Sequence, residues 1–260
     1  MAAIVNPESL GRPLATAFYY WRGFLSLVGY ATRRLHVLRL APVQRVFHRQ
    51  IYFTGVQALG AVGLIALIAG VVITTQIVSL LGAANPNLTS RILLWTLVRE
   101  LGPLLTAIVI IARSSAATAS ELANMQLRGE LDNLRRLGIE PLDYLVVPRI
   151  AGITVAVVAV TFYFQAIAIV SGLGFIALVR DFSFGRGLQS VVELLTLTEV
   201  SVSLLKAFVF GLVIAATSCL YGLRVERSVT DIPRAVTRAV LQNVLTLFLL
   251  DALITYLFFI

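Results

Sequence analysis

The stretch IYFTGVQALGAVGLIALIAGVVITTQIVSLL, residues 51–81, decides the fold class because it contains no charged side chain. An α-helix needs about 20 apolar residues to cross the hydrocarbon core of a bilayer. Lipid offers the backbone no hydrogen-bond partners, so a crossing segment must be a helix or part of a closed barrel. Polar and apolar residues do not alternate here as they do in a barrel strand. We therefore predict a transmembrane helix.

Further apolar stretches of similar length follow along the chain, at residues 91–120, 150–179, 201–222 and 237–258. The composition agrees with them, because hydrophobic residues make up 58% of the chain and charged residues only 13%. Soluble domains carry about 25% charged residues. We predict an all-α integral membrane protein with about five transmembrane helices.

Basic residues give the chain a net charge of +8, and most of them lie beside the apolar stretches. This placement is typical of membrane flanks and argues against a nucleic-acid-binding surface. Fifteen of them fall on the side of the N-terminal segment and three on the other, which predicts a cytoplasmic N-terminus. Five crossings then place Ile260 on the outer side. The first residues lack the pattern of a signal peptide, so we expect the first span to direct insertion.

The chain divides at about residue 50 into an N-terminal segment, 1–50, and a transmembrane domain, 51–260. The N-terminal segment places five apolar residues at helical spacing ahead of a basic stretch at 31–49: Leu14, Phe18, Trp21, Leu25 and Val28. An amphipathic helix of this kind lies in the membrane interface, with its basic side chains near anionic lipid. Within the second domain we expect a short outer helix in residues 181–199.

Residues that could carry catalysis or hold a metal are scarce. The chain has one cysteine, Cys219, and both histidines lie in the N-terminal segment. The single lysine, Lys206, stands inside an apolar stretch and not in a phosphate-binding loop of the form G-x-x-x-x-G-K-[ST]. We therefore expect no catalytic residue, no metal site and no cofactor bound by this chain.

Charged residues inside the apolar stretches are costly in lipid and usually face a bundle interior or a wet cavity. Arg99 and Glu100 precede Gly102 and Pro103, which weaken a helix and free a carbonyl. This pattern predicts a polar kink lining a substrate cavity, or else an anchor near the outer membrane surface. Asp251 could pair with a basic residue on another helix or lie in contact with water.

Small residues follow Arg113, with the sequence SSAATAS at 114–120. Small side chains let helix backbones approach closely in lipid. We interpret this run as a helix-packing surface.

Residues 127–138, LRGELDNLRRLG, form the centre of the longest connection on the cytoplasmic side. Leu127, Leu131 and Leu134 share one helical face, and Gly138 is placed as a C-terminal cap. A short, charged, capped helix between two spans suits docking to a cytoplasmic partner. The alternative is a solvated linker helix.

These segments together resemble the MlaE/YrbE family of ABC transporter permeases. The most specific part is RELGP at 99–103, followed by Arg113, Ala117, Glu121 and Met125. LGIEP at 137–141 and LVVPR at 145–149 fit as well, as do Gln76 in the first span and Asp251 and Thr255 in the last. One departure lies in the segment 127–138, where the family usually has Glu-Gln and this chain has Gly129-Glu130.

The resemblance implies a permease subunit that works as a homodimer in a bacterial inner membrane. It implies a cytoplasmic ABC ATPase dimer that binds the ATP, a periplasmic MCE-type substrate-binding protein, and phospholipids or other hydrophobic molecules as substrates. The lipid pathway would include Arg99, Glu100, Gln76 and Asp251. The ATPase-coupling residues would be Glu130, Leu131, Asp132, Leu134, Arg135, Leu137 and Gly138.

Two other classes of function remain open at this point. An ion-coupled secondary transporter usually has internal repeats with matching broken helices, and no repeat is visible in this chain. A non-transporting membrane scaffold could recruit cytoplasmic proteins through residues 121–148. ATP-dependent lipid movement would distinguish the permease from both.

Overall fold

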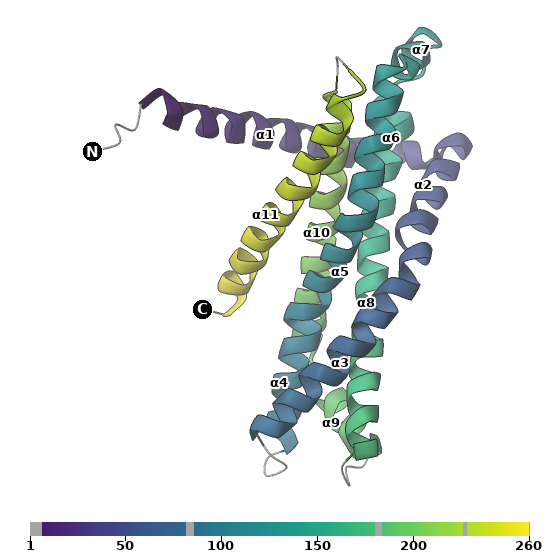
Figure 1. Cartoon of the computed structure of the whole chain (residues 1–260). Helices are drawn as coiled ribbons and strands as arrows, with labels where there is room; N and C mark the ends of the chain where they lie inside the picture. Colours follow the sequence, from purple (N-terminus) through teal and green to yellow (C-terminus); the bar gives the residue numbers. More distant parts are fainter. Residues whose placement is uncertain (1–6, 82–85, 180–183, 226–227, 260) are drawn as a thin grey trace.

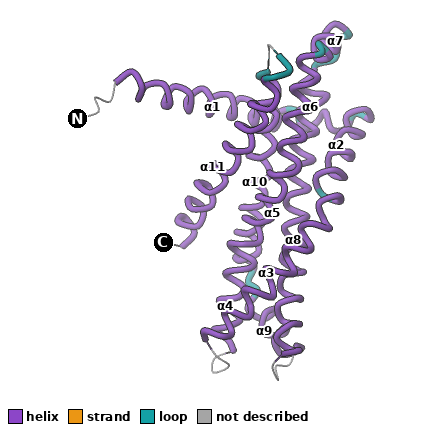
Figure 2. Tube along the Cα trace, in the orientation of Figure 1, coloured by secondary structure: helices purple, strands orange, loops and turns teal. Residues whose placement is uncertain are grey.

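The computed structural model describes residues 7–81, 86–179, 184–225 and 228–259, and within these ranges every regular element is a helix (Figures 1 and 2). The predicted all-α class is thereby confirmed. The chain end at Ile260 lies outside the described residues.

The described residues contain five helices long and apolar enough to cross a membrane, as predicted. They are Ala41–Leu80, Leu88–Leu127, Leu142–Val179, Leu197–Leu223 and Asp231–Phe258. Each begins before the apolar stretch that the sequence marks, because residues that flank the stretch continue its helix.

The first span is built from α2 (Ala41–Thr54), a 3₁₀ turn (Val56–Ala58) and α3 (Leu59–Leu81). The boundary expected at residue 50 is therefore not an element boundary. Pro42 lies in the first turn of α2, where its missing N–H costs nothing, and no breaker follows it before Gly55. The basic residues of α2 thus belong to the helix of the first span and not to a separate interfacial segment.

The second span contains two wide turns of π-helix between its α-helical parts. Its elements are α4 (Pro86–Leu94), η3 (Trp95–Leu101), α5 (Gly102–Ile110), η4 (Ile111–Ser115) and α6 (Ala116–Leu127). The remaining spans are η5 with α8 (Leu142–Val146, Val147–Val179), α10 (Leu197–Leu223) and α11 (Asp231–Phe259). Single π turns inside α-helices are frequent at functional sites, so η3 and η4 are candidate positions for function.

Helix α1 (Pro7–Arg33) extends sideways from the upper part of the bundle, crosswise to the spans (Figure 1). The Tyr20 hydroxyl lies 2.7 Å from Thr217 Oγ1 of α10, and the Tyr30 hydroxyl donates to Asp143 Oδ1 of η5 at 2.7 Å. Burial, together with that hydrogen bond, raises the pKa of Tyr30 to about 12. Two contacts therefore fix the C-terminal half of α1 against the bundle, and its place in the membrane interface stays a prediction.

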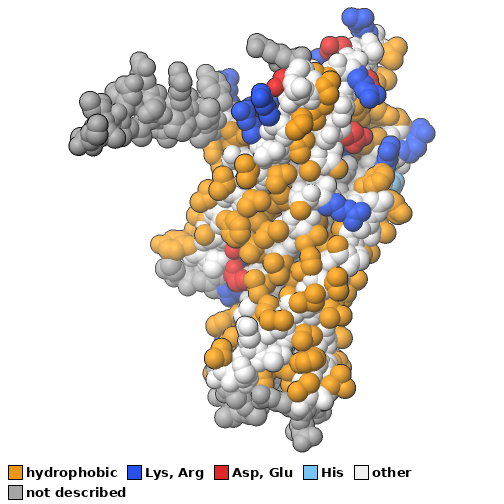
Figure 3. Space-filling view, in the orientation of Figure 1, with side chains coloured by type: hydrophobic (Ala, Val, Ile, Leu, Met, Phe, Trp, Pro, Cys, Tyr) orange, Lys and Arg blue, Asp and Glu red, His pale blue; other side chains and the backbone are white. Residues whose placement is uncertain are grey.

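The opposite end of the bundle carries α9 (Phe184–Leu194), beside α4 (Figure 1). It is the short helix expected in residues 181–199, which ends earlier because α10 already begins at Leu197. Figure 3 shows the basic side chains gathered at the end with α1 and α7 (Glu130–Arg136), and a mostly apolar surface over the lower half of this face.

Helices α8 and α10 lie at the centre of the bundle, whereas α3 and α11 lie at its edge. In the most apolar 18 residues of the second, third and fourth spans, 56–61% of the residues are buried. In the first and fifth spans the share is 22%. Leucines such as Leu67 on α3 and Leu249 on α11 are exposed in the single chain. These two faces are therefore left for lipid or for another protein.

The small residues after Arg113 pack against α10, as predicted. Ser115 Oγ accepts from Ser218 Oγ and from Asn243 Nδ2, both at 2.8 Å, in a buried network that joins three spans. A Cβ added to Gly222 would lie 2.8 Å from the carbonyl oxygen of Ala119. The close approach of α6 and α10 therefore depends on small side chains on both helices.

Candidate functional site: a charged cluster between three spans

Five charged side chains meet between the second, fourth and fifth spans. We call them the charged cluster: Arg99 and Glu100 from η3, Glu199 and Lys206 from α10, and Asp251 from α11. The sequence predicted charged residues in these spans but not that they converge. In Figure 3 a small charged patch interrupts the apolar middle of the visible face.

Lys206 is the centre of the cluster and its side chain is 0% exposed. Its ammonium group donates to Glu100 Oε2 at 2.7 Å, to Asp251 Oδ1 at 2.9 Å and to Thr255 Oγ1 at 2.8 Å. An ammonium group has three protons, so its donor capacity is fully used. A buried charge is tolerated only when it is paired and hydrogen-bonded in this way.

Arg99 and Glu199 form the other half of the cluster. Arg99 Nη1 lies 3.6 Å from Glu199 Oε1, and Trp95 Nε1 donates to the same oxygen at 3.1 Å. Arg99 Nε lies 4.0 Å from Glu100 Oε1, at the limit of an ion pair. Adjacent residues on a helix point in different directions, and the shortest ion pairs of Arg99 and Glu100 are indeed with α10.

The π turn at η3 and the proline after it create the local geometry of the cluster. In this wide turn Gly102 N–H donates to Leu97 O, so the carbonyl of Val98 would pair with the N–H of residue 103. Residue 103 is proline and has no N–H. Gln165 Nε2 of α8 donates to that carbonyl instead, at 2.8 Å. The freed carbonyl predicted from Gly102-Pro103 is present, and a neighbouring span satisfies it.

Gly102 is required for this arrangement. A Cβ at residue 102 would lie 2.9 Å from both Cγ and Nε2 of Gln165. Gln165 also donates to Ser203 Oγ of α10 at 2.6 Å. Gln165 therefore ties η3 to α10 next to the charged cluster, and only glycine leaves room for it.

The cluster is closed on one side and open on the other. It contains two cations and three carboxylates, so its formal charge is −1. Lys206 is fully buried, but the Glu100 side chain is 35% exposed. Within the described ranges no three His, Cys, Asp or Glu side chains are arranged to hold a metal ion. The arrangement can orient the polar part of a ligand at Glu100, next to apolar helix faces.

The structure brings together three of the four residues predicted for the pathway: Arg99, Glu100 and Asp251. Arg99 is buried in protein and lies 3.6 Å from Glu199 of α10, and its depth in the membrane stays a prediction. Asp251 pairs with a basic residue on another helix, one of the two alternatives. Gln76 lies exposed on α3 and has no contact with the cluster.

Sequence reasoning missed the roles of Lys206, Glu199 and Gln165. Lys206 offered a signal, because a lone lysine in an apolar span needs a carboxylate partner. Glu199 gave a weaker signal, since it stands near the beginning of its span. Gln165 is one amide in a long apolar helix, and its partner is a backbone carbonyl that no side-chain pattern reveals.

The connection between α6 and α8 contains a helix shorter than the predicted segment 127–138. Leu127 ends α6, Gly129 adopts a left-handed conformation with φ of 70°, and α7 occupies Glu130–Arg136. Gly138, with φ of 76°, caps it as expected: Gly138 N–H donates to Arg135 O at 2.9 Å and Ile139 N–H to Leu134 O at 3.0 Å.

Two faces of α7 and its cap differ in exposure. Leu131 is buried against the bundle, while Leu137 is 75% exposed. Asp132 and Arg135 are also exposed and form an ion pair of 3.1 Å. The helix is thus held by an apolar anchor and presents charged side chains with one exposed leucine beyond them.

Comparison with known proteins places this arrangement in a family. The family described as Permease MlaE matches residues 47–257, which include all five residues of the charged cluster and α7. The chain belongs to the MlaE permease family. Residues 47–257 also include three spans in full and nearly all of the first and fifth, so the family match extends over the five-span bundle.

Individual relatives agree with this membership. A probable ABC transporter permease protein of Rickettsia conorii is 30% identical over 214 residues, which are 81% of this chain and 82% of the relative. A probable ABC transporter permease protein of Synechocystis is 28% identical over 226 residues, 86% of each chain. The chloroplastic protein TRIGALACTOSYLDIACYLGLYCEROL 1 of Arabidopsis thaliana is 27% identical over 246 residues, 93% of this chain and 69% of the relative.

Proposed function

We propose that this MlaE-family protein is the membrane subunit of an ABC transporter that moves phospholipids or other hydrophobic molecules between inner and outer membranes. A separate ATPase binds and hydrolyses the ATP. Three findings support the lipid substrate: the family, the Arabidopsis relative named after a galactolipid, and a polar cluster set among apolar spans. The observation that carries the proposal is the polar cluster, in which the partly exposed Glu100 lies beside the buried Lys206.

The charged cluster would act on the headgroup of the lipid. Lys206 holds Glu100 and Asp251 in place, so the open side of Glu100 is fixed in direction. A polar headgroup hydrogen-bonds there, and its acyl chains lie on the neighbouring apolar helix faces. Arg99, paired with Glu199, contributes to the electrostatic potential at the headgroup position.

The assembly follows from the two ends and the exposed faces of the bundle. A homodimer would cover part of the apolar surface that α3 and α11 expose. The ATPase would dock at α7, on the cytoplasmic side with the N-terminus, and an MCE-type protein at the periplasmic end near α9. The excess of basic side chains at the α7 end supports this orientation in a bacterial inner membrane.

Transport by a reconstituted complex tests the function. The permease, its ATPase and its MCE partner are placed in donor vesicles, and phospholipid transfer is measured with and without ATP. Glu100→Gln removes the charge at the open side of the cluster and should reduce ATP-dependent transfer at least about tenfold, the effect of losing about 1.4 kcal/mol of headgroup interaction.

Asp231→Asn is the control, because Asp231 begins α11, away from the charged cluster, and contacts Ser228 and Arg234 close to it in sequence. It should transfer lipid at the wild-type rate. Equal transfer by both variants would contradict the role of Glu100. Lipid movement that needs an ion gradient but no ATPase would indicate a secondary transporter, and assembly without lipid movement would indicate a scaffold.

Docking of the ATPase is tested separately. Glu130→Lys with Asp132→Lys reverses the charge of the first turn of α7 while Leu131 still anchors the helix. We expect weaker co-purification of the ATPase with normal membrane insertion. Charge reversal at Glu193 on α9 serves as the control, and undiminished co-purification of the double variant would move the interface away from α7.

A further inference from the structure

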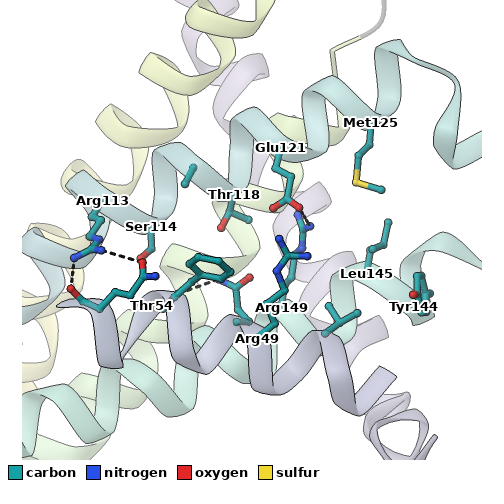
Figure 4. A pocket seen from close by; sticks show the side chains of 15 residues that line it. Arg49, Thr54, Arg113, Ser114, Thr118, Glu121, Met125, Tyr144, Leu145 and Arg149 are labelled. Atoms are coloured by element: carbon teal, nitrogen blue, oxygen red, sulfur yellow. Dashed lines mark hydrogen bonds and ion pairs between the residues drawn. The ribbon is translucent and has the colours of Figure 1, made fainter. Parts of the chain in front are cut away.

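A second polar region lies between α2 and α6, over η5 and the beginning of α8 (Figure 4). It is a cleft of about 450 Å³, and none of its lining residues belongs to the charged cluster. We call it the arginine cleft, because Arg49, Arg113 and Arg149 line it together with a single acidic residue, Glu121. Its formal charge is +2, opposite in sign to that of the cluster.

Arg149 is the most buried of the three arginines, at 4% exposure. Its Nη2 atom lies 3.0 Å from Glu121 Oε1, but its Nη1 atom is buried without a hydrogen-bond partner. A buried polar group without a partner costs free energy, and more so when it is charged. The cleft therefore lacks one acceptor at its most buried cation.

The two other arginines flank this position differently. Arg113 donates through Nη1 to the carbonyl of Gln57 and through Nη2 to Gln57 Oε1 at 3.0 Å, which closes one end of the cleft (Figure 4). Arg49 is exposed, and its guanidinium lies 5.3 Å from the centre of the Phe53 ring. Because no ion pair holds Arg49 within the described chain, it can turn toward an anion beside Arg149.

Part of the remaining lining is an apolar wall, beside polar residues such as Gln50 and Thr118. Phe53 comes from α2, Met125 from α6 and Leu145 from η5, and Figure 4 shows Met125 and Leu145 away from Arg113, toward the other end of the cleft. A small inorganic anion would use the arginines and leave this wall empty. An anion carrying a hydrocarbon chain would use both.

We propose that the arginine cleft binds the phosphate group of a membrane phospholipid, with an acyl chain along the wall of Phe53, Met125 and Leu145. Arg149 Nη1 and Arg49 would donate to the phosphate, since arginine donors match phosphate oxygens in geometry and charge. Glu121 holds Arg149 in place and, as a carboxylate beside a phosphate, also limits the affinity. The site is separate from the lipid pathway at Glu100 and does not depend on transport.

Photo-crosslinking in the full-length permease tests the site. A photoreactive phenylalanine replaces Ala117, which lines the cleft and is exposed. The purified protein in non-ionic detergent is illuminated with phosphatidylglycerol, or with a diacylglycerol that has the same chains and no phosphate. We expect capture of phosphatidylglycerol at position 117 and little capture of diacylglycerol. Equal capture of both would overturn the proposal.

Charge variants in this background give effects of opposite sign. Arg49→Gln should weaken phosphatidylglycerol binding about tenfold, as expected for loss of one charge-assisted contact. Glu121→Gln should strengthen it about threefold, because it removes a like charge but keeps an acceptor for Arg149. Arg45→Gln makes the same charge change one turn earlier on α2, outside the lining, and should leave binding unchanged.

The outcomes separate the two sources of phosphate. Inorganic phosphate at the lipid's concentration should not prevent capture, and if it does, the site is one for free phosphate and the lipid assignment fails. Equal effects of Arg49→Gln and Arg45→Gln would also overturn the proposal, because general surface charge would then explain binding. None of these measurements uses ATP or Glu100. The cleft proposal can therefore fail while the transport function stands, and the transport function can fail while the cleft proposal stands.

Discussion

The charged cluster and the arginine cleft are two polar regions in one apolar bundle, and they solve the problem of buried charge differently. In the cluster, Lys206 uses all three ammonium donors on partners from two spans. In the cleft, Arg149 keeps one buried donor atom without a partner. A cation satisfied by its own chain holds helices together, whereas a cation left incomplete points to a ligand. This contrast supports a structural role for Lys206 and the binding site that we propose in the cleft.

The largest expected effect comes from breaking the cluster at Lys206. Lys206→Met leaves Glu100 and Asp251 without their shared cation, and loss of one partner of a buried ion pair costs about 3–5 kcal/mol. The free energy of unfolding in detergent should fall by that amount. Adding Asp251→Asn and Glu100→Gln should recover much of the loss. A decrease below about 1 kcal/mol would show that the cluster does not hold the spans together.

A smaller effect is expected at Gly102, which keeps Gln165 between η3 and α10. Gly102→Ala places a Cβ 2.9 Å from Gln165 and should lower the unfolding free energy by about 1–3 kcal/mol, the usual cost of overpacking. Gly174→Ala on α8 is the control, because no atom lies within 4 Å of its added Cβ. It should be neutral or slightly stabilising, and an equal loss in both variants would contradict the role of Gly102.

The smallest expected effect is the stabilisation of the folded protein by a lipid bound in the arginine cleft. If its cations need a ligand, phosphatidylglycerol at 100 times its dissociation constant should stabilise the folded protein by about 2.7 kcal/mol. Arg49→Gln, with about tenfold weaker binding, should lose about 1.4 kcal/mol of that stabilisation. Thermal unfolding with and without the lipid measures the difference. Stabilisation that is equal in Arg45→Gln and Arg49→Gln would place the lipid elsewhere.

The sequence predicts most of the fold, because a helix that crosses lipid must contain about 20 mostly apolar residues and is easily found. Long apolar stretches locate all five spans, and the glycine cap at Gly138 appears where the sequence places it. The ends of elements were less accurate. The basic run before residue 50 hides the fact that α2 continues into the first span, and Gly129 interrupts the predicted helix with a left-handed residue.

The candidate site was only partly predictable, because it depends on contacts between distant spans. Arg99, Glu100 and Asp251 stand out as charges in apolar runs, but nothing local indicates that all three converge with Lys206 and Glu199. The replacement of the missing N–H of Pro103 by Gln165 depends on the relative register of two spans. That register is set by packing and not by any local motif.

Photo-crosslinking from residue 100 tests the central claim most directly, that lipid passes the open side of the charged cluster. A photoreactive residue replaces Glu100 in the full-length permease, assembled with its ATPase and MCE partner in phospholipid membranes, and the same residue replaces Glu193 on α9 as the control. The account predicts a phospholipid adduct at position 100 that exceeds the adduct at position 193 and changes in amount when ATP is added. An adduct at position 100 no greater than the control, and unchanged by ATP, would contradict it.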